Sequence, residues 1–388
     1  MKTIYLDNGA TTMVDPKVVE AMRPYFTERY GNASSTHHKG QEAKMALEES
    51  REAIAKSIGA RHDEIIFTSG GTESNNLAIK GLAFANKEKG DHIITTKIEH
   101  DCVLNACKWL ETQGFRVTYL DVDSEGFVDP KQLEKSITKK TILVSVIHGN
   151  NEIGTIQDIK ALGDVCRKRN VLFHTDACQS YTKTELNVKK QNLDLVTINS
   201  HKIHGPKGVG ALFIRKGINM TPLLHGGGHE RNRRSGTENV AGAVGFAKAV
   251  KLAKSSHVKQ MKKLRDHAIQ ELLKIPDTML NGAEGESRLC NNINMTFRYV
   301  EGESIGAYLD AKKGICTSTG SACSSHTLEP SHVLLAVGIK PEDAHGSLRI
   351  TLSRFTTKEE IDVFLNTLPG IIDKLRKMSP LAKTDSGW

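Results

Sequence analysis

The sequence has no long run of apolar residues. A helix that spans a bilayer needs about 20 consecutive, mostly apolar residues, and no stretch of this 388-residue chain comes near that length. The first residues, Met1 to Asp7, also lack the apolar core of a secretory signal peptide. We therefore expect a cytoplasmic protein that does not associate with membranes.

Paired cysteines are missing as well. The cysteines are odd in number and scattered, without a Cys-x-x-Cys pair, which argues against a disulfide framework and a zinc knot. Cys166 and Cys178 are expected to pack as small buried hydrophobes. The seven cysteines are Cys102, Cys107, Cys166, Cys178, Cys290, Cys316 and Cys323.

The sequence contains no zinc-finger or RNA-recognition pattern to accompany its net charge of +8. Its lysines and arginines are spread along helical stretches, for example from Lys248 to Lys274, where they alternate with apolar positions. This spacing is typical of a solvated helix face. We therefore expect no direct binding to nucleic acid, and a basic nucleic-acid-binding protein remains one alternative.

Short apolar runs alternate with amphipathic stretches between residues 63 and 215. This alternation predicts an α/β fold with a mostly parallel, seven-stranded sheet, in which ligands bind beyond the carboxyl ends of the strands. The expected strands are Glu64–Thr68, His92–Thr96, Arg116–Leu120, Thr141–Ile147, Val171–Thr175, Leu193–Asn199 and Gly210–Arg215. The expected helices between them include Ser74–Lys87, Val103–Gln113 and Ile159–Arg169.

The pattern changes after this region. Residues 242–274 are expected to form one long basic helix, and a compact α+β unit is expected to follow it. The first dozen residues precede the α/β pattern and can pack with that unit. We therefore predict a large α/β domain at 14–257 and a smaller α+β domain formed by residues 1–13 and 258–388.

Lys202 is the most informative residue. It follows an apolar run, Leu193 to Ile198, that predicts a buried strand, and a Gly/Pro turn comes after it. Burial disfavours the ammonium and favours the neutral, nucleophilic amine. Amines of this kind form Schiff bases with carbonyl cofactors such as pyridoxal phosphate. The ordinary alternative is a lysine that reaches solvent from a turn, and the other strand ends decide against it.

Polar groups follow the ends of four other expected strands. Gly71 and Thr72 form a candidate phosphate cradle, because free N–H groups at a helix start attract an anion. His100 can stack on a ring and exchange protons. The amides around Asn151 can bond a ring hydroxyl or a substrate carboxylate. Asp176 can pair with a pyridinium nitrogen and so make the ring an electron sink. With the lysine, these groups supply what pyridoxal-phosphate chemistry requires.

Cys323 lies in a run of small polar residues, Thr317 to Thr327. Such a segment can bury little apolar surface, which predicts a mobile loop. A cysteine there is poorly explained as a core residue, whereas a reactive thiol that moves into an active site fits. Cys323 is therefore the candidate nucleophile.

These motifs together resemble the group I cysteine desulfurases of the NifS/IscS type, which are fold type I, class V aminotransferase-like enzymes that use pyridoxal 5'-phosphate. The resemblance covers essentially the whole chain. Its most specific parts are Ser200-His201-Lys202, Ser321-Ala322-Cys323 and the segment 233–237. Asn199-Ser200 stands where many members carry Ser-Gly, which leaves open which of the two residues contacts the phosphate.

The resemblance implies a role for each site residue. Lys202 would bind the cofactor covalently, His100 would handle substrate protons, and Cys323 would take sulfur from L-cysteine, leaving L-alanine and a persulfide. Asn151 and Arg349 would bind the substrate, since an arginine fork suits a carboxylate. The implied cofactor-binding set is Gly71, Thr72, His100, Asn151, Asp176, Gln179, Ser200, His201, Lys202 and, from a second subunit, Thr237.

The resemblance also implies partners. These are a second copy of the chain, an iron–sulfur scaffold protein and other sulfur acceptors, such as carriers for tRNA thiolation. Cys323 could further ligate a transient [2Fe–2S] cluster shared with the scaffold. The alternatives are a relative specialised for selenocysteine, a plain β-lyase, and a sulfur- or iron–sulfur-carrying protein without turnover. The presence of Lys202, His100 and Arg349 argues against the last.

Overall fold

The computed structural model describes residues 3–319 and 329–379. Its largest sheet has seven strands in the order β2-β8-β7-β6-β5-β3-β4. Neighbouring strands from β7 to β4 run parallel, whereas β8 is antiparallel to both β2 and β7. The predicted α/β fold with a mostly parallel sheet is therefore confirmed. The strands are β2 Ile65–Thr68, β3 His92–Thr96, β4 Arg116–Leu120, β5 Thr141–Ser145, β6 Leu172–Asp176, β7 Leu195–Asn199 and β8 Gly210–Ile214.

The reversed strand β8 decides where the end of β2 lies. Because β8 is antiparallel to both of its neighbours, β2 points the same way as β7, and the carboxyl ends of both strands lie at one edge of the sheet. Gly210 begins β8 directly beside Gly70, and a Cβ atom at Gly210 would lie 2.8 Å from the Gly70 backbone. The glycine thus permits a close approach that brings the loop after β2 to the end of β7.

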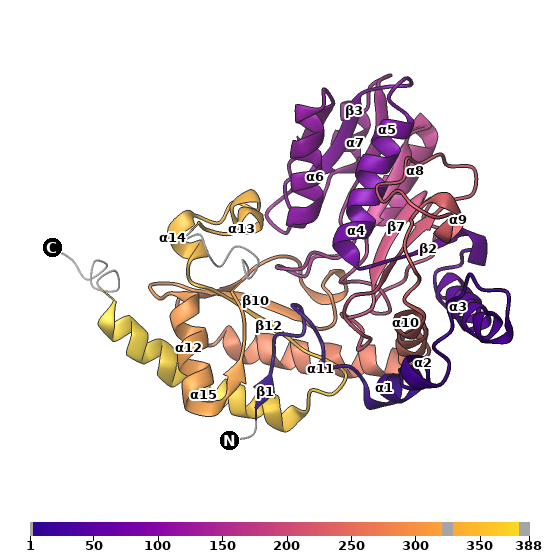
Figure 1. The fold of residues 1–388 in the computed structure, drawn as a ribbon. Coiled ribbons are helices and arrows are strands. Elements are labelled where there is room, and N and C mark those ends of the chain that lie inside the picture. Colours follow the sequence, from indigo (N-terminus) through magenta and orange to yellow (C-terminus); the bar gives the residue numbers. More distant parts are fainter. Residues whose placement is uncertain (1–2, 320–328, 380–388) are drawn as a thin grey trace.

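Helices cover both faces of this sheet (Figure 1). Successive strand residues such as Leu195 and Val196 point to opposite faces of the sheet and are buried in different hydrophobic clusters, as the two-residue period of a strand requires. One cluster is completed by α3, α7, α8 and α10, and the other by residues 77–79, which follow α4, and by α5 and α6. These helices are α3 His38–Ser57, α4 Gly71–Asn76, α5 Leu82–Ala85, α6 Asp101–Thr112, α7 Pro130–Ser136, α8 Ile159–Arg169 and α10 Val240–Leu252.

The expected helix Ser74–Lys87 begins earlier and is not uniform. It starts at Gly71, and a π-helical turn, Leu77–Gly81, separates α4 from α5. Such turns often occur near functional sites. The start at Gly71 places the first free N–H groups of the helix directly after the loop at the end of β2.

The remaining elements build a second core, which lies apart from the large sheet in Figure 1. Ile4 and Leu6 from the start of the chain are buried in it with residues between 261 and 372. Its strands are β1 Ile4–Tyr5, β9 Thr278–Leu280, β10 Asn292–Phe297, β11 Ile315–Cys316 and β12 Ser347–Thr351, where β1 pairs with β11 and β10 lies between β9 and β12. Its main helices are α11 Ser255–Leu272, α12 Gly302–Lys313 and α15 Lys358–Met378. The shorter helices elsewhere are α1 Pro16–Met22, α2 Pro24–Thr27, α9 His229–Asn232, α13 His332–Ala336 and α14 Pro341–Ala344.

The prediction of one continuous helix over residues 242–274 was wrong. Ala253 and Lys254 adopt extended conformations and separate α10 from α11. The apolar residues of α10 are buried in the core of the large sheet, whereas those of α11 are buried in the second core. A straight helix could not place both faces in their own cores, so the chain turns between them.

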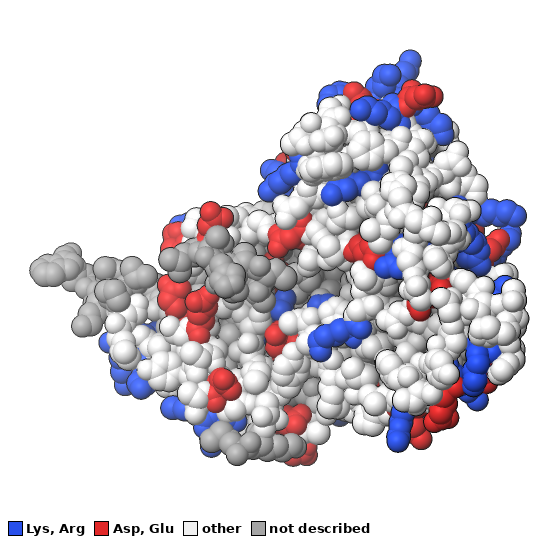
Figure 2. Space-filling model, in the orientation of Figure 1, with Lys and Arg blue, Asp and Glu red and all other residues white. Residues whose placement is uncertain are grey.

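The surface has a mixed charge. On the face in Figure 2, Lys and Arg side chains are scattered among Asp and Glu and do not form one continuous basic patch. No helix in residues 3–319 and 329–379 is both long and apolar enough to cross a membrane.

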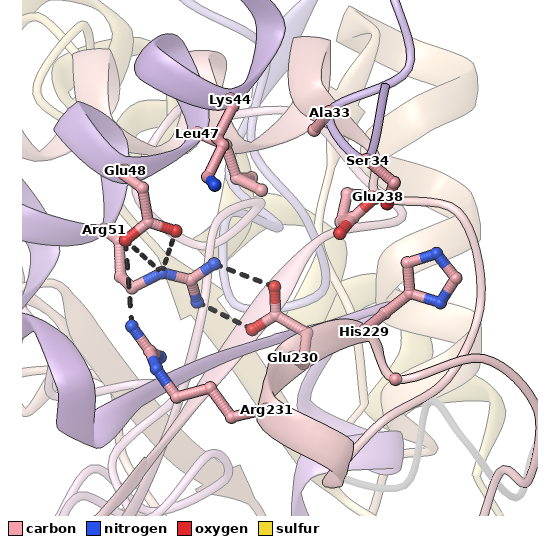
Figure 3. A pocket seen from close by; sticks show the side chains of 11 residues that line it. Ala33, Ser34, Lys44, Leu47, Glu48, Arg51, His229, Glu230, Arg231 and Glu238 are labelled. Carbon is pink, nitrogen blue, oxygen red and sulfur yellow. Dashed lines mark hydrogen bonds and ion pairs between the residues drawn. The ribbon is translucent and has the colours of Figure 1, made fainter. Parts of the chain in front are cut away.

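A buried ion pair fixes the segment that follows β8. The Arg51 guanidinium on α3 donates to both carboxylate oxygens of Glu230, at 2.6 and 2.9 Å, and each side chain is 3% exposed (Figure 3). The pair also reaches β2, because Arg51 donates to the carbonyl of Ile65 and Glu230 accepts from the N–H of Phe67. Glu230 and Arg231 have positive φ angles of 46° and 58°, so the Arg51–Glu230 ion pair holds a strained turn in place.

We expect Glu230→Gln to lower the free energy of unfolding by about 3–5 kcal/mol, because it leaves the buried charge of Arg51 with Glu48, an exposed side chain, as its remaining carboxylate partner. Urea unfolding followed by circular dichroism measures the loss. Lys358→Gln is the control, since it breaks the exposed Lys358–Asp362 pair and should leave the urea midpoint unchanged. Equal effects of the two substitutions would contradict this account.

Candidate active site

Lys202 lies in the turn after β7, next to the start of the chain. Backbone bonds from Ile203 and Gly205 to the carbonyl of Ser200 close the turn. The Lys202 ammonium donates to the carbonyl of Ala10 at 2.7 Å and to that of Gly9. The segment around residue 10 is therefore packed against the end of β7.

Gln179 reaches the same acceptor from the neighbouring strand end. Its side-chain amide donates to the Gly9 carbonyl at 2.9 Å, and Gln179 is 7% exposed. One backbone carbonyl thus receives the side chains of both Lys202 and Gln179. His201 adds a further contact to this segment, between its Nδ1 and the Thr11 hydroxyl at 3.1 Å. The prediction from the sequence named these residues but not the Gly9 carbonyl that joins two of them.

Asp176 is the last residue of β6 and is 4% exposed. One carboxylate oxygen accepts from the Cys178 N–H at 2.9 Å, and the other accepts from the side-chain amide of Asn75 at 2.6 Å. Asn75 lies on α4, so the helix that begins at Gly71 also orients the carboxylate. Asn75 was not predicted from the sequence, although its place one turn beyond the cradle was a usable signal.

The candidate phosphate cradle lies beside the ends of β6 and β7. A Cβ atom at Gly71 would lie 2.8 Å from the Cys178 sulfur and 3.6 Å from the Asn199 side-chain nitrogen. Glu73 accepts from the Ser69 N–H and from Arg234, at 2.7 and 2.8 Å. The cradle is therefore tied to the segment 233–237. Thr237, predicted to act in a second subunit, is exposed.

His100 caps the start of α6. Its Nδ1 accepts from the Cys102 N–H at 3.2 Å and lies 3.1 Å from the Cys102 sulfur. A ring that accepts at Nδ1 carries the proton of its neutral form on Nε2, which leaves Nε2 as the atom for proton exchange.

Two thiols, those of the partly buried Cys102 and the buried Cys178, lie close to Asp176 but are poor nucleophiles. Burial, reinforced by the negative charge of Asp176, raises the pKa of Cys102 to about 12. The same two causes raise the pKa of Cys178 well above its ordinary value. Since the thiolate is the reactive form, neither thiol is suited to attack a substrate at neutral pH. Cys323 lies outside the described residues.

Arg349 lies on β12 and is 3% exposed. Its guanidinium donates to the Asn151 carbonyl and to the Asp7 carboxylate, both at 3.1 Å, and to the Ser318 hydroxyl at 3.4 Å. The arginine thus brings together the loop after β5, the start of the chain and the segment after β11. Both predicted substrate-binding residues, Asn151 and Arg349, meet here.

Several buried polar atoms in these segments have no hydrogen-bond partner, and such atoms are costly unless a ligand satisfies them. Asn199 lies beside Gly71, whereas Ser200 points toward Gly205, where a Cβ would collide with its hydroxyl. Asn199 is therefore better placed than Ser200 for a group held in the cradle. The set supplies amide, hydroxyl and guanidinium groups and fits a phosphorylated, hydroxylated ring: Asn75 Oδ1, Asn151 Oδ1, Asn199 Oδ1, Ser200 Oγ and Arg349 Nε.

Comparisons with known proteins show which proteins this chain resembles over its length. The chain is 54% identical to the cysteine desulfurase IscS of Dictyoglomus turgidum, and the aligned region covers 98% of this chain and 97% of that protein. It is equally identical to the cysteine desulfurase IscS of Methanosarcina thermophila, over 98% and 94% of the two chains.

Solved structures show the same likeness. A NifS-like protein superposes with a TM-score of 0.90 and 39% identity over 96% of this chain and 100% of its own. The apo structure of a cysteine desulfurase from Thermococcus onnurineus gives a TM-score of 0.84 and 29% identity, over 96% and 95%. Residues 4–364 match the aminotransferase class-V family. The chain belongs to the aminotransferase class-V family.

Proposed function

We propose that this chain is a pyridoxal-phosphate-dependent cysteine desulfurase that converts L-cysteine to L-alanine and a Cys323 persulfide. The observation that carries the proposal is the convergence of Lys202 and Gln179 on the Gly9 carbonyl, beside the buried carboxylate of Asp176. The two relatives named cysteine desulfurase IscS, each 54% identical over nearly the whole chain, support the same activity here.

The cofactor would be held by groups from several strand ends. Lys202 would bind it covalently, Asp176 would pair with its ring nitrogen and Gln179 with its ring oxygen. When bound, pyridoxal phosphate supplies an electron sink that weakens bonds in the attached amino acid. The phosphate would bind to the N–H groups at the start of α4 and to nearby side chains. We assign to it Gly71, Thr72, Ser200, His201 and Thr237, with Asn199 as an added candidate.

The substrate would be held by Arg349 and Asn151, and its protons moved by Lys202 and His100. The unpartnered Arg349 Nε and Asn151 Oδ1 are free to contact the carboxylate and amino groups of cysteine. The Lys202 amine, once displaced by the substrate, would remove the Cα proton. His100 would exchange protons through Nε2, since its Nδ1 is occupied by α6.

Sulfur transfer is assigned to Cys323. Its thiolate would attack the substrate sulfur, so that a new S–S bond forms while the Cβ–S bond breaks, and the carbon fragment leaves as alanine after protonation. The raised pKa values of Cys102 and Cys178 argue against either as the acceptor. The persulfide would pass to an iron–sulfur scaffold protein or another sulfur acceptor. A [2Fe–2S] cluster shared with the scaffold through Cys323 belongs to the same proposal, and the cytoplasm remains the predicted location.

We propose in addition two domains and a homodimer. The change of core between α10 and α11 supports the predicted boundary near residue 257. Exposed Val19, Phe26, Tyr30 and Met45, on or beside α1 to α3, give the chain apolar surface that a second copy can bury. Thr237 would then reach the phosphate of the partner's site.

Borohydride reduction of the holoenzyme should fix the cofactor to a peptide that contains Lys202. Lys202→Ala should lose this label and release no alanine from cysteine, because the amine that binds the cofactor and moves the proton is gone. Lys207→Ala is the matched control, since Lys207 is an exposed lysine of the same turn and its loss should leave both results unchanged. A label on Lys207 or Lys183 would overturn the assignment.

Co-expression of Lys202→Ala and Thr237→Ala chains tests whether Thr237 acts across the dimer. In a mixed dimer, the site that keeps Lys202 also receives an intact Thr237 from the other chain. We therefore expect purified mixed dimers to show about half of the activity of the wild-type dimer and to retain the cofactor tightly at one of their two sites. If mixed dimers show only the activity of the Thr237→Ala chain, Thr237 does not act in the partner's site.

A further inference from the structure

The turn after β6 contains a lysine for which the proposed chemistry has no role. Tyr181, just before it, is 1% exposed and is anchored in the large core, with its hydroxyl 2.6 Å from the Ser57 hydroxyl and its ring edge-on to Phe246. Lys183 follows two residues later, and its side chain extends toward the site instead. The turn is thus held by Tyr181 in the large core and by Lys183 at the site.

Thr182, between these two residues, has a strained backbone. Its φ angle is +62°, a left-handed conformation that β-branched residues rarely adopt. Such strain persists where the surrounding structure fixes the chain, and it gathers at functional sites. Here it allows Tyr181 to point into the core while Lys183 points to the site.

The Lys183 ammonium bonds the backbones of two residues of the cofactor site. It donates to the Gln179 carbonyl at 2.8 Å and to the Lys202 carbonyl at 3.3 Å. The side chains of these two residues in turn both donate to the carbonyl of Gly9. These contacts form a closed ring of hydrogen bonds. The Lys183 ammonium joins the backbone carbonyls of Gln179 and Lys202, and the Gly9 carbonyl joins their side chains.

Lys183 keeps this place although burial disfavours its charge and lowers its pKa to about 8. A charged donor forms stronger hydrogen bonds to carbonyls than a neutral one, and its loss would remove a donor from two carbonyls. A lysine whose charge is disfavoured by burial, but which is held between two backbone carbonyls of the site, indicates that its contacts serve the site.

We propose that Lys183 is a positioning residue of the cofactor site, which ties the backbones of Gln179 and Lys202 together so that both side chains are set for the cofactor. The inference rests on the proposed function, because it assumes that Lys202 and Gln179 bind the cofactor. It adds a residue that touches neither the cofactor nor the substrate.

The charge of Lys183 should also act on the Lys202 nitrogen. A nearby positive charge disfavours protonation. Burial is the main cause that lowers the pKa values of His201 and His204, and the charge of Lys183 adds to it in both. Asp15 is the carboxylate of this region and is paired with Arg354 at 2.5 Å. The titratable and charged groups that face Lys183 are Cys178 after β6, His201, Lys202 and His204 after β7, Lys254 and His257 at the start of α11, Cys290 before β10 and Arg354 after β12.

The test compares Lys183→Met with Lys189→Met, which removes an exposed lysine of the same region. The rate of pyridoxal phosphate release into an excess of apo-acceptor should rise at least tenfold in Lys183→Met and stay unchanged in Lys189→Met. The pH midpoint of the cofactor absorbance should shift upward in Lys183→Met alone. This shift should be seen below about pH 8, where wild-type Lys183 is charged.

Further variants separate positioning from general stability. Lys183→Arg keeps the charge and the donors and should restore the absorbance midpoint and most of the slow release. Thr182→Gly should raise the melting temperature, because glycine accepts the positive φ angle, and it should leave cofactor release unchanged. Lys183→Gln is the second neutral variant if Lys183→Met does not fold, and it should show the same upward shift.

The inference is overturned if a folded neutral variant releases the cofactor at the wild-type rate with an unmoved midpoint. That failure differs from a failure of the proposed function. If borohydride labels a residue other than Lys202 in the wild-type protein, the proposed function fails whatever Lys183 does. If Lys202 is labelled and Lys183→Met behaves as wild type, only the role of Lys183 is lost.

Discussion

The backbone carbonyl of Gly9 is the acceptor on which the site depends. It receives Lys202 and Gln179, which come from two neighbouring strand ends. Gly9 is itself held from β12, since its N–H donates to the Thr351 hydroxyl at 2.6 Å. The start of the chain, the large sheet and the three-stranded sheet therefore meet at a single residue, Gly9, and a shift in any of them would move the lysine that is proposed to bind the cofactor.

Near Gly9, burial and hydrogen bonding give the Asp176 carboxylate and the thiols beside it different protonation states. Asp176 keeps two hydrogen-bond donors at its carboxylate, which suits a group that must pair with a ring nitrogen. The thiols beside it are instead held protonated by burial and by that carboxylate. A desulfurase needs a reactive thiolate that can also deliver sulfur elsewhere. The arrangement therefore favours a thiol from outside this buried cluster, as the sequence around Cys323 predicts.

The sequence predicted the parts of the fold that local patterns determine. The strands appeared as short apolar runs, and because parallel strands end at one edge, Asp176 and Lys202 could be placed near each other. The break at Ala253 and Lys254 could not be predicted, since it depends on two cores that attract different helices. Asn75 and Lys183 were missed for a similar reason: their partners lie far away in the sequence or belong to the backbone.

The central claim is that Cys323 receives the sulfur of L-cysteine. Mass spectrometry of the holoenzyme after addition of cysteine without reductant tests it most directly. We predict one added sulfur atom on the peptide that contains Cys323, and none in Cys323→Ser, which should still bind the cofactor. Added sulfur on the peptide that contains Cys102, or unchanged sulfur uptake in Cys323→Ser, would contradict the account.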